Sequence, residues 1–116
     1  METENTKFNL KYALDLPMWE IFVPASNIDA EFSYEHHKIF DEFVKQKAQG
    51  ITVMRGAKGE WISPSGVLFK DRIIPCRICC SIGDIHSIMR FALKHYNQEA
   101  IMAYKISDHV LMVKNG

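Results

Sequence analysis

The stretch Asp84-Ile-His-Ser-Ile-Met-Arg-Phe-Ala-Leu-Lys-His-Tyr-Asn97 decides the fold. Its apolar side chains recur at the spacing of one helix face, at positions 85, 88, 89, 92 and 96. Asp84 is the expected N-cap of this helix, and Asn97 is expected to end it in the left-handed conformation. Strand-like segments flank the helix, at residues 67–81 before it and 100–106 after it. The stretch therefore predicts a strand–helix–strand unit.

The preceding half of the chain has the same pattern. Residues 18–23, Met18-Trp-Glu-Ile-Phe-Val23, are typical of a central strand, and Ser33 is the expected N-cap of a helix over residues 34–48. Residues 51–54 are rich in β-formers and lead through Arg55-Gly-Ala-Lys-Gly59 into residues 60–62. The two glycines of that segment leave two interpretations open, a tight hairpin across them or one strand with a bulge.

The resulting element order, β-α-β-β-α-β, predicts an α+β fold of the ferredoxin-like, split βαβ type. Its antiparallel sheet carries two helices on one face. An extra N-terminal strand is expected at residues 7–12, and residues 1–6 are expected to be disordered. The chain is predicted to form a single domain over residues 1–116.

The sheet face opposite the helices has no cover in this fold. We expect it to carry Leu68 and Ile74, with Trp19 or Phe22 depending on the register of the first strand. Apolar surface left in water is costly. This face therefore predicts a homodimer.

Composition limits the class of protein further. The 116 residues are 47% hydrophobic and 24% charged, which is typical of a globular domain. Lys plus Arg (14) balances Asp plus Glu (14), so a nucleic-acid partner is disfavoured. The sequence has no signal-like leader and no apolar run of the roughly 20 residues that a membrane helix needs. We therefore expect a cytoplasmic protein without membrane contact.

Cys76, Cys79 and Cys80 fall within one short segment. The first two have the C-x-x-C spacing of zinc and redox sites, but no second pair follows. The surrounding isoleucines favour an extended strand, on which the thiols diverge onto two faces. The main interpretation is three free thiols packed as small apolar residues, with no metal and no cofactor, and redox or metal work is the alternative.

The segments Gly50-Ile-Thr-Val53, Gly59-Glu-Trp61 and Gln98-Glu-Ala-Ile101 occur in this order. In them the chain resembles an uncharacterised family of small bacterial ferredoxin-like proteins with a Gly-[Leu/Ile]-Thr-Val…Gly-x-Trp core and a Gln-Glu-x-[Val/Ile] stretch. Asp71 falls where that family carries an acidic residue. The resemblance spans residues 18–104 and implies the same fold. It implies no reaction, because the family has no established activity.

Asp71 is the polar residue that the strand pattern makes most informative. It shares a strand face with Phe69 and Ile73, and a carboxylate on an apolar face needs a partner. Arg72 or Arg77 is the expected partner. The pair would form part of a ligand site or, as the alternative, a structural ion pair.

Three more polar residues complete the candidate ligand site. Gln98 and Glu99 lie at the corner between the second helix and the last strand, which the predicted topology places roughly 10 Å from Asp71, across the first strand. His86 lies in the first turn of the second helix, where the helix dipole favours a neutral imidazole. The predicted ligand-binding residues are Asp71, Arg72, Arg77, Gln98, Glu99 and His86.

Three functions remain open at this point. The leading hypothesis is a non-catalytic domain that self-associates and binds a small, anionic ligand or a protein partner, because no complete catalytic motif is present. The second is a small enzyme that uses Asp71, Glu99 and His86 in one cleft. The third is a nucleic-acid-binding module, which the balanced charge disfavours. A ferredoxin-like fold supports all three.

Overall fold

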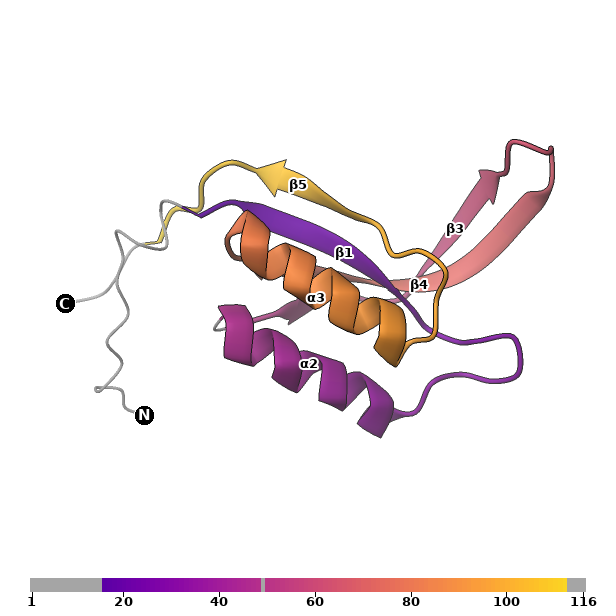
Figure 1. The fold of residues 1–116 in the computed structure, drawn as a ribbon, viewed down its shortest axis with the longest axis horizontal. Helices are drawn as coiled ribbons and strands as arrows, with labels where there is room; N and C mark the ends of the chain where they lie inside the picture. Colours follow the sequence, from indigo (N-terminus) through magenta and orange to yellow (C-terminus); the bar gives the residue numbers. More distant parts are fainter. Residues whose placement is uncertain (1–15, 49, 113–116) are drawn as a thin grey trace.

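The computed structural model describes residues 16–48 and 50–112 of the chain (Figure 1). The strand expected at residues 7–12 and the disordered segment expected at residues 1–6 lie outside the described residues. The elements, in chain order, are β1 (Met18–Pro24), α2 (Tyr34–Ala48), β2 (Thr52–Val53), β3 (Ala57–Ile62), β4 (Leu68–Cys79), α3 (Ile82–His95) and β5 (Ala103–Ser107).

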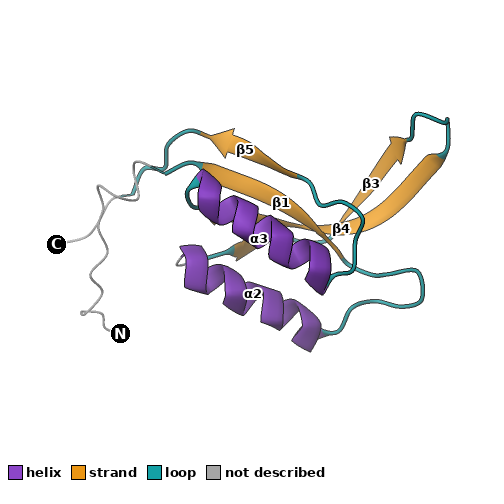
Figure 2. Cartoon of the chain, in the orientation of Figure 1, coloured by secondary structure: helices purple, strands orange, loops and turns teal. Residues whose placement is uncertain are grey.

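All strand pairs are antiparallel, and the sheet order is β2-β4-β1-β5, with β3 also paired to β4. Both helices lie on one face of this sheet (Figures 1 and 2). The arrangement confirms the predicted ferredoxin-like α+β fold. Beyond the end of β1, β3 and the first half of β4 continue as a two-stranded arm away from the helices (Figure 2).

The strands β2 and β3 are one strand interrupted by a bulge. Val53 pairs with Cys76 and Ala57 with Ile73, so this strand has one residue more than β4 between the two pairs. Pro75 lies opposite the bulge, and its carbonyl accepts a hydrogen bond from the Met54 amide at 2.9 Å. The missing N–H of the proline therefore faces the irregular segment, where no ladder bond is lost. The bulge interpretation is confirmed, and the hairpin interpretation is wrong.

The helix ends follow local hydrogen-bonding rules. Ser33 caps α2, since its Oγ accepts from the His36 amide at 3.1 Å. At α3 the expected N-cap, Asp84, is wrong: Ser81 is the cap, and its Oγ accepts from the Asp84 amide at 3.1 Å. Ser81 caps the helix three residues before the expected position, so Asp84 lies in the first turn of α3. Asn97, with φ of 52°, takes the left-handed conformation as predicted.

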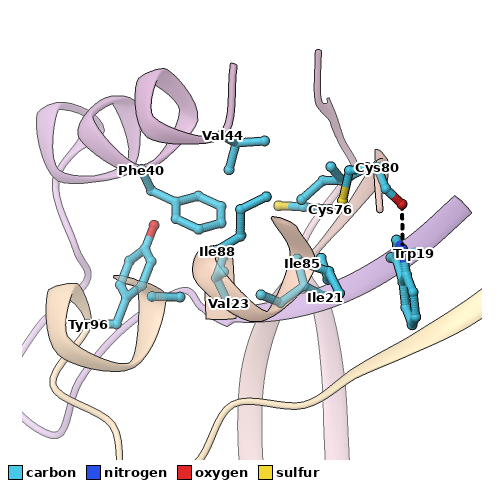
Figure 3. Packing of buried hydrophobic residues seen from close by; sticks show 12 residues of the cluster. Trp19, Ile21, Val23, Phe40, Val44, Cys76, Cys80, Ile85, Ile88 and Tyr96 are labelled. Atoms are coloured by element: carbon cyan, nitrogen blue, oxygen red, sulfur yellow. Dashed lines mark hydrogen bonds between the residues drawn. The ribbon is translucent and has the colours of Figure 1, made fainter. Parts of the chain in front are cut away.

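The core lies between the helices and the two central strands (Figure 3). Alternate residues of β1 and β4 face the helices, and the Trp19 indole donates to the Cys80 carbonyl at 2.9 Å. Cys76 and Cys80 are buried in this core, and both are free thiols. The buried set comprises Trp19, Ile21, Val23, Phe40, Val44, Cys76, Ile78, Cys80, Ile85, Ile88, Ala92 and Tyr96.

The sheet face opposite the helices carries different residues from those expected. Ile74 packs against the core on the helix side, so its predicted place is wrong. Of the two alternatives, Trp19 is buried on the helix side. Leu68 lies on the arm, where it pairs with Ile62. Only Phe22 is on the open face as expected. The register of β1 places Phe22 between core-facing Ile21 and Val23, and side chains alternate along a strand.

Candidate functional site

A buried carboxylate lies at the centre of the open sheet face. Glu20 is 6% exposed and belongs to β1, between β4 and β5. Its direct neighbours across the two strands are Arg77 and Tyr104. Arg77 Nε donates to Glu20 Oε1 at 2.8 Å, and the Tyr104 hydroxyl donates to Oε2 at 2.5 Å. Both carboxylate oxygens are therefore paired, which offsets the cost of burying the charge.

These two partners stabilise the ionised form of the carboxyl. The hydrogen bond from Tyr104, with the hydrogen bond and charge of Arg77, holds the pKa of Glu20 below its usual value despite burial. The same carboxylate raises the pKa of Tyr104. At neutral pH the cluster is therefore an ionised glutamate between a cation and a neutral phenol.

Arg77 uses only one of its nitrogens in this cluster. Nε pairs with Glu20, and among residues 16–48 and 50–112 the terminal guanidinium nitrogens have no hydrogen-bond or ion-pair partner. The Arg77 side chain is 45% exposed. A guanidinium held at Nε still offers two terminal NH₂ groups, which is the fork that binds a carboxylate or phosphate.

Arg77 also lines a cavity of about 400 Å³. The cavity lies between the end of α2, the start of α3 and the neighbouring ends of β1, β2 and β4. Its lining combines aliphatic, thioether, thiol and charged side chains. The lining residues are Leu16, Met18, Lys47, Ala48, Gly50, Ile51, Thr52, Arg77, Cys79, Cys80, Asp84, Val110 and Met112.

The thiols of this lining are protonated at neutral pH. Burial, with smaller contributions from Asp84 and Cys79, raises the pKa of Cys80 to about 12. Burial also raises the pKa of Cys79. Because the thiolate is the nucleophile, these protonated thiols are poorly prepared for nucleophilic attack.

A second polar cluster joins the two helices at the other end of α3. His36 and His95 stack with ring centroids 3.7 Å apart, and each ring donates to the backbone carbonyl of the other residue. His37 Nδ1 lies 2.8 Å from the hydroxyl of buried Tyr96. Burial lowers the pKa of His37. The side chains of His36 and His37 on α2 contact His95 and Tyr96 at the end of α3, so the cluster holds the two helices together.

The structure does not bring the sequence-predicted residues into one place. Asp71 lies on the arm, where its carboxylate accepts from the Trp61 indole at 3.4 Å, and it is exposed. The expected pairing of Asp71 with an arginine is wrong, because Arg72 pairs with Glu31 and Arg77 pairs with Glu20. Six residues along β4 put Asp71 about 20 Å from Arg77.

The remaining predicted residues lie apart from the cavity as well. Gln98 and Glu99 follow the end of α3, about 20 Å from its first turn, and the Gln98 amide donates to the Tyr96 carbonyl at 3.0 Å. His86 is exposed on α3 and is not part of the cavity lining. Of the six predicted residues, Arg77 is the one that both lines a cavity and has free donors.

Glu20 and Tyr104 were missed by the sequence argument. The signal for Glu20 was present, since it is the one charged residue inside Met18-Trp-Glu-Ile-Phe-Val23. A carboxylate in the middle of a central strand needs a partner across the sheet, and this argument applies better to Glu20 than to Asp71. Tyr104 had no such signal, because its role depends on the register of β5 against β1.

Two further properties bear on function. Within residues 16–48 and 50–112, no three His, Cys, Asp or Glu side chains are grouped so that they could hold a metal ion. In the same part of the chain, neither helix is long and apolar enough to span a membrane.

The structure is that of a small ferredoxin-like α+β protein with a cavity whose lining includes the charged residues Lys47, Arg77 and Asp84. Solved structures share this fold at low sequence identity. CutA1 from Oryza sativa is 11% identical with a TM-score of 0.59, covering 90% of this chain and 84% of that chain. The divalent cation tolerance protein Cut A1 from Thermus thermophilus is 12% identical with a TM-score of 0.58, covering 82% and 87%.

A phage SAM lyase, solved in complex with S-methyl-5'-thioadenosine, is equally similar. It is 12% identical with a TM-score of 0.58, and the match covers 85% of this chain and 86% of that chain. No protein-family model matches the sequence, and no curated protein is similar to it in sequence. The comparisons therefore support the fold, and the resemblance to a bacterial family stays a prediction.

Proposed function

We propose that this chain is a non-catalytic, self-associating protein that binds a small anion-bearing ligand in the cavity at Arg77. The observation that carries the proposal is the state of Arg77. Buried Glu20 accepts a hydrogen bond from Arg77 Nε, the terminal nitrogens of Arg77 have no partner among the described residues, and Arg77 lines the cavity. An arginine fixed in this way has lost side-chain freedom before any ligand arrives, which favours anion binding.

The rest of the lining suits a small organic anion. Ligand sites are mostly apolar, with a few polar groups that fix orientation, and they commonly measure about 300–1,000 Å³. This cavity measures about 400 Å³ and places Met18, Ile51 and Met112 beside Arg77. A ligand with an anionic group and an apolar body fits that combination.

Self-association through the open sheet face is the second part of the proposal. The face is defined by Phe22, Tyr104 and Ile106, and the last two side chains are about two-fifths exposed, at 43% and 40%. Phe22 and Tyr104 pack edge to face with ring centroids 5.8 Å apart, which joins two aromatic side chains of this face. Covering such a surface with a second copy is worth about 25 cal/mol per Å² of apolar area.

The names of the similar structures suggest other ligands, which are tested beside the anion. Divalent cation tolerance is in the name of one of them, but in the described part of this chain no three His, Cys, Asp or Glu side chains are grouped so that they could hold a metal ion. S-methyl-5'-thioadenosine is the ligand named for the phage SAM lyase. It carries no anionic group, so tight binding of this nucleoside without an effect of Arg77 would favour the enzyme alternative.

Isothermal titration calorimetry with sodium hexanoate tests the proposal. We expect binding to the natural chain and about tenfold weaker binding to Arg77→Lys, which keeps the charge but loses the fork. The double variant Glu20→Gln, Arg77→Gln removes the ion pair without leaving a buried charge, and it should not bind hexanoate. Arg72→Gln, on the arm, is the matched control and should bind like the natural chain. Equal binding by all four proteins, or by none, would overturn the proposal.

A further inference from the structure

The cavity at Arg77 contains a negative side chain that the proposed anion site does not explain. Asp84, in the first turn of α3, lines the cavity and is partly buried. Its backbone amide is bonded to the Ser81 hydroxyl, but among residues 16–48 and 50–112 its carboxylate forms no ion pair. A ligand that is only anionic would meet repulsion at this carboxylate.

Lys47 does not neutralise Asp84 in the described structure. The Lys47 ammonium lies 5.7 Å from the centre of the Phe43 ring, and Phe43 is not part of the cavity lining. Of the three charged residues in the lining, Lys47 is directed to the Phe43 ring, whereas the Asp84 carboxylate and the terminal nitrogens of Arg77 have no ion pair among residues 16–48 and 50–112. They come from different elements, the end of β4 and the start of α3.

Apolar side chains make up most of the remaining wall. Met18, Ile51 and Met112 contribute to it, together with Cys79 and Cys80. A ligand complementary to the whole cavity therefore has one charge at each of two points and an apolar segment between them.

We propose that the cavity binds a linear amphoteric molecule, with its anionic group on Arg77 and an ammonium group at Asp84. This inference rests on the proposed function, since the anionic end is the group assigned to Arg77 above. The chemical class is an ω-amino acid or a similar compound in which an apolar chain separates the two charges. Asp84 then acts as the residue that selects amphoteric ligands over simple anions.

Helix electrostatics gives Asp84 another role that the experiment must separate. A carboxylate in the first turn of a helix interacts favourably with the helix dipole, whether or not a ligand is bound. That role predicts an effect on stability and none on ligand choice. The ligand role predicts a change in the preference between two probes that differ only in an amino group.

Calorimetry with two matched series provides this separation. The first series is 4-aminobutanoate, 6-aminohexanoate and 8-aminooctanoate, and the second is the carboxylates of equal length without the amino group. We expect the best amino acid to bind the natural chain about fivefold more tightly than its carboxylate, a gain typical of a partly exposed ion pair. In Asp84→Asn the gain should vanish, while the carboxylate binds at least as well as before.

Asp29→Asn is the control, since it removes one exposed negative charge outside the cavity and should leave the gain unchanged. If the amino acids never bind better than their carboxylates, the inference is overturned while the anion site stands. If Asp84→Asn weakens both series equally, Asp84 has a structural role only and the inference is also overturned. If neither series binds the natural chain, the proposed function fails together with the inference.

Discussion

His36 and His95 each donate a ring N–H to the backbone carbonyl of the other residue, at 2.8 and 2.7 Å. The first bond satisfies one of the last carbonyls of α3, which have no partner inside the helix. The second ties α3 back to the first turn of α2. Phe32 extends the stack beyond His36, and Phe91 extends it beyond His95. The pair therefore fastens the start of α2 to the end of α3.

Removing one ring should weaken this fastening. We expect His36→Ala to lower the free energy of unfolding by about 1–2 kcal/mol, because the His95 carbonyl loses its donor and the ring stack is interrupted. His36→Gln keeps an N–H donor on the side chain and should lose less. Urea unfolding measures both, with His86→Ala, an exposed residue of α3, as the control. An equal loss of unfolding free energy in His86→Ala would show that the reciprocal hydrogen bonds of His36 and His95 do not stabilise the fold.

Acid should destabilise the protein partly through Glu20. The pKa of Glu20 is lower in the folded chain than the ordinary value of 4.5, because Tyr104 and Arg77 stabilise the carboxylate. Its contribution to stability is therefore complete above pH 4.5 and is lost as the pH falls through the lowered, folded-state pKa. Thermal unfolding from pH 7 to pH 3 should show a steeper loss for the natural chain than for Glu20→Gln. Parallel curves would contradict the assignment of Glu20.

The buried thiols should be unreactive in the folded protein. The pKa of Cys76 and that of Cys80 are raised to about 12, mainly by burial, so at pH 8 about one thiol in ten thousand is ionised. Alkylation by iodoacetamide should therefore be slow at both residues until the chain is unfolded. Peptide mapping of the Cys79→Ala variant assigns the sites without interference from the adjacent thiol. Rapid native labelling at Cys76 or Cys80 would contradict the packing described for them.

A charge on the open sheet face should disrupt self-association. We expect the natural chain to be a homodimer in light scattering and Ile106→Lys to be monomeric, because the lysine would be buried without a partner. Ile28→Lys is the control, since Ile28 is 98% exposed in the loop between β1 and α2. A natural chain with the mass of one copy at tens of micromolar would contradict the proposed interface.

The parts of the fold that follow from local rules could be predicted from the sequence. The apolar stripe of α3, the Ser33 cap of α2 and the left-handed Asn97 depend on residues within a few positions of one another. The position of the cap of α3 was missed because Ser81 and Asp84 are both good capping residues, and only the hydrogen-bond geometry decides between them.

The site depends on register, which the sequence does not display. Arg77 was a candidate because of its residue type. Its partner Glu20 is 57 positions away, and the two residues become neighbours only through the pairing of β4 with β1 along the whole strand. Asp71 was predicted as a site residue because it is a carboxylate on an apolar strand face. The arm leaves that face in water, so burial, the premise of the argument, does not apply there.

Nuclear magnetic resonance of the Arg77 side chain tests most directly whether Arg77 lies between a buried carboxylate and a ligand-binding cavity. Hexanoate is titrated into protein labelled with ¹⁵N, and the Arg77 side-chain resonances are assigned by their absence from Arg77→Lys. We expect the resonances of the terminal guanidinium nitrogens to shift with hexanoate, together with the amides of Thr52 and Cys79, while the Trp61 indole resonance on the arm does not move. Saturable shifts at the arm with unchanged Arg77 resonances would contradict this expectation.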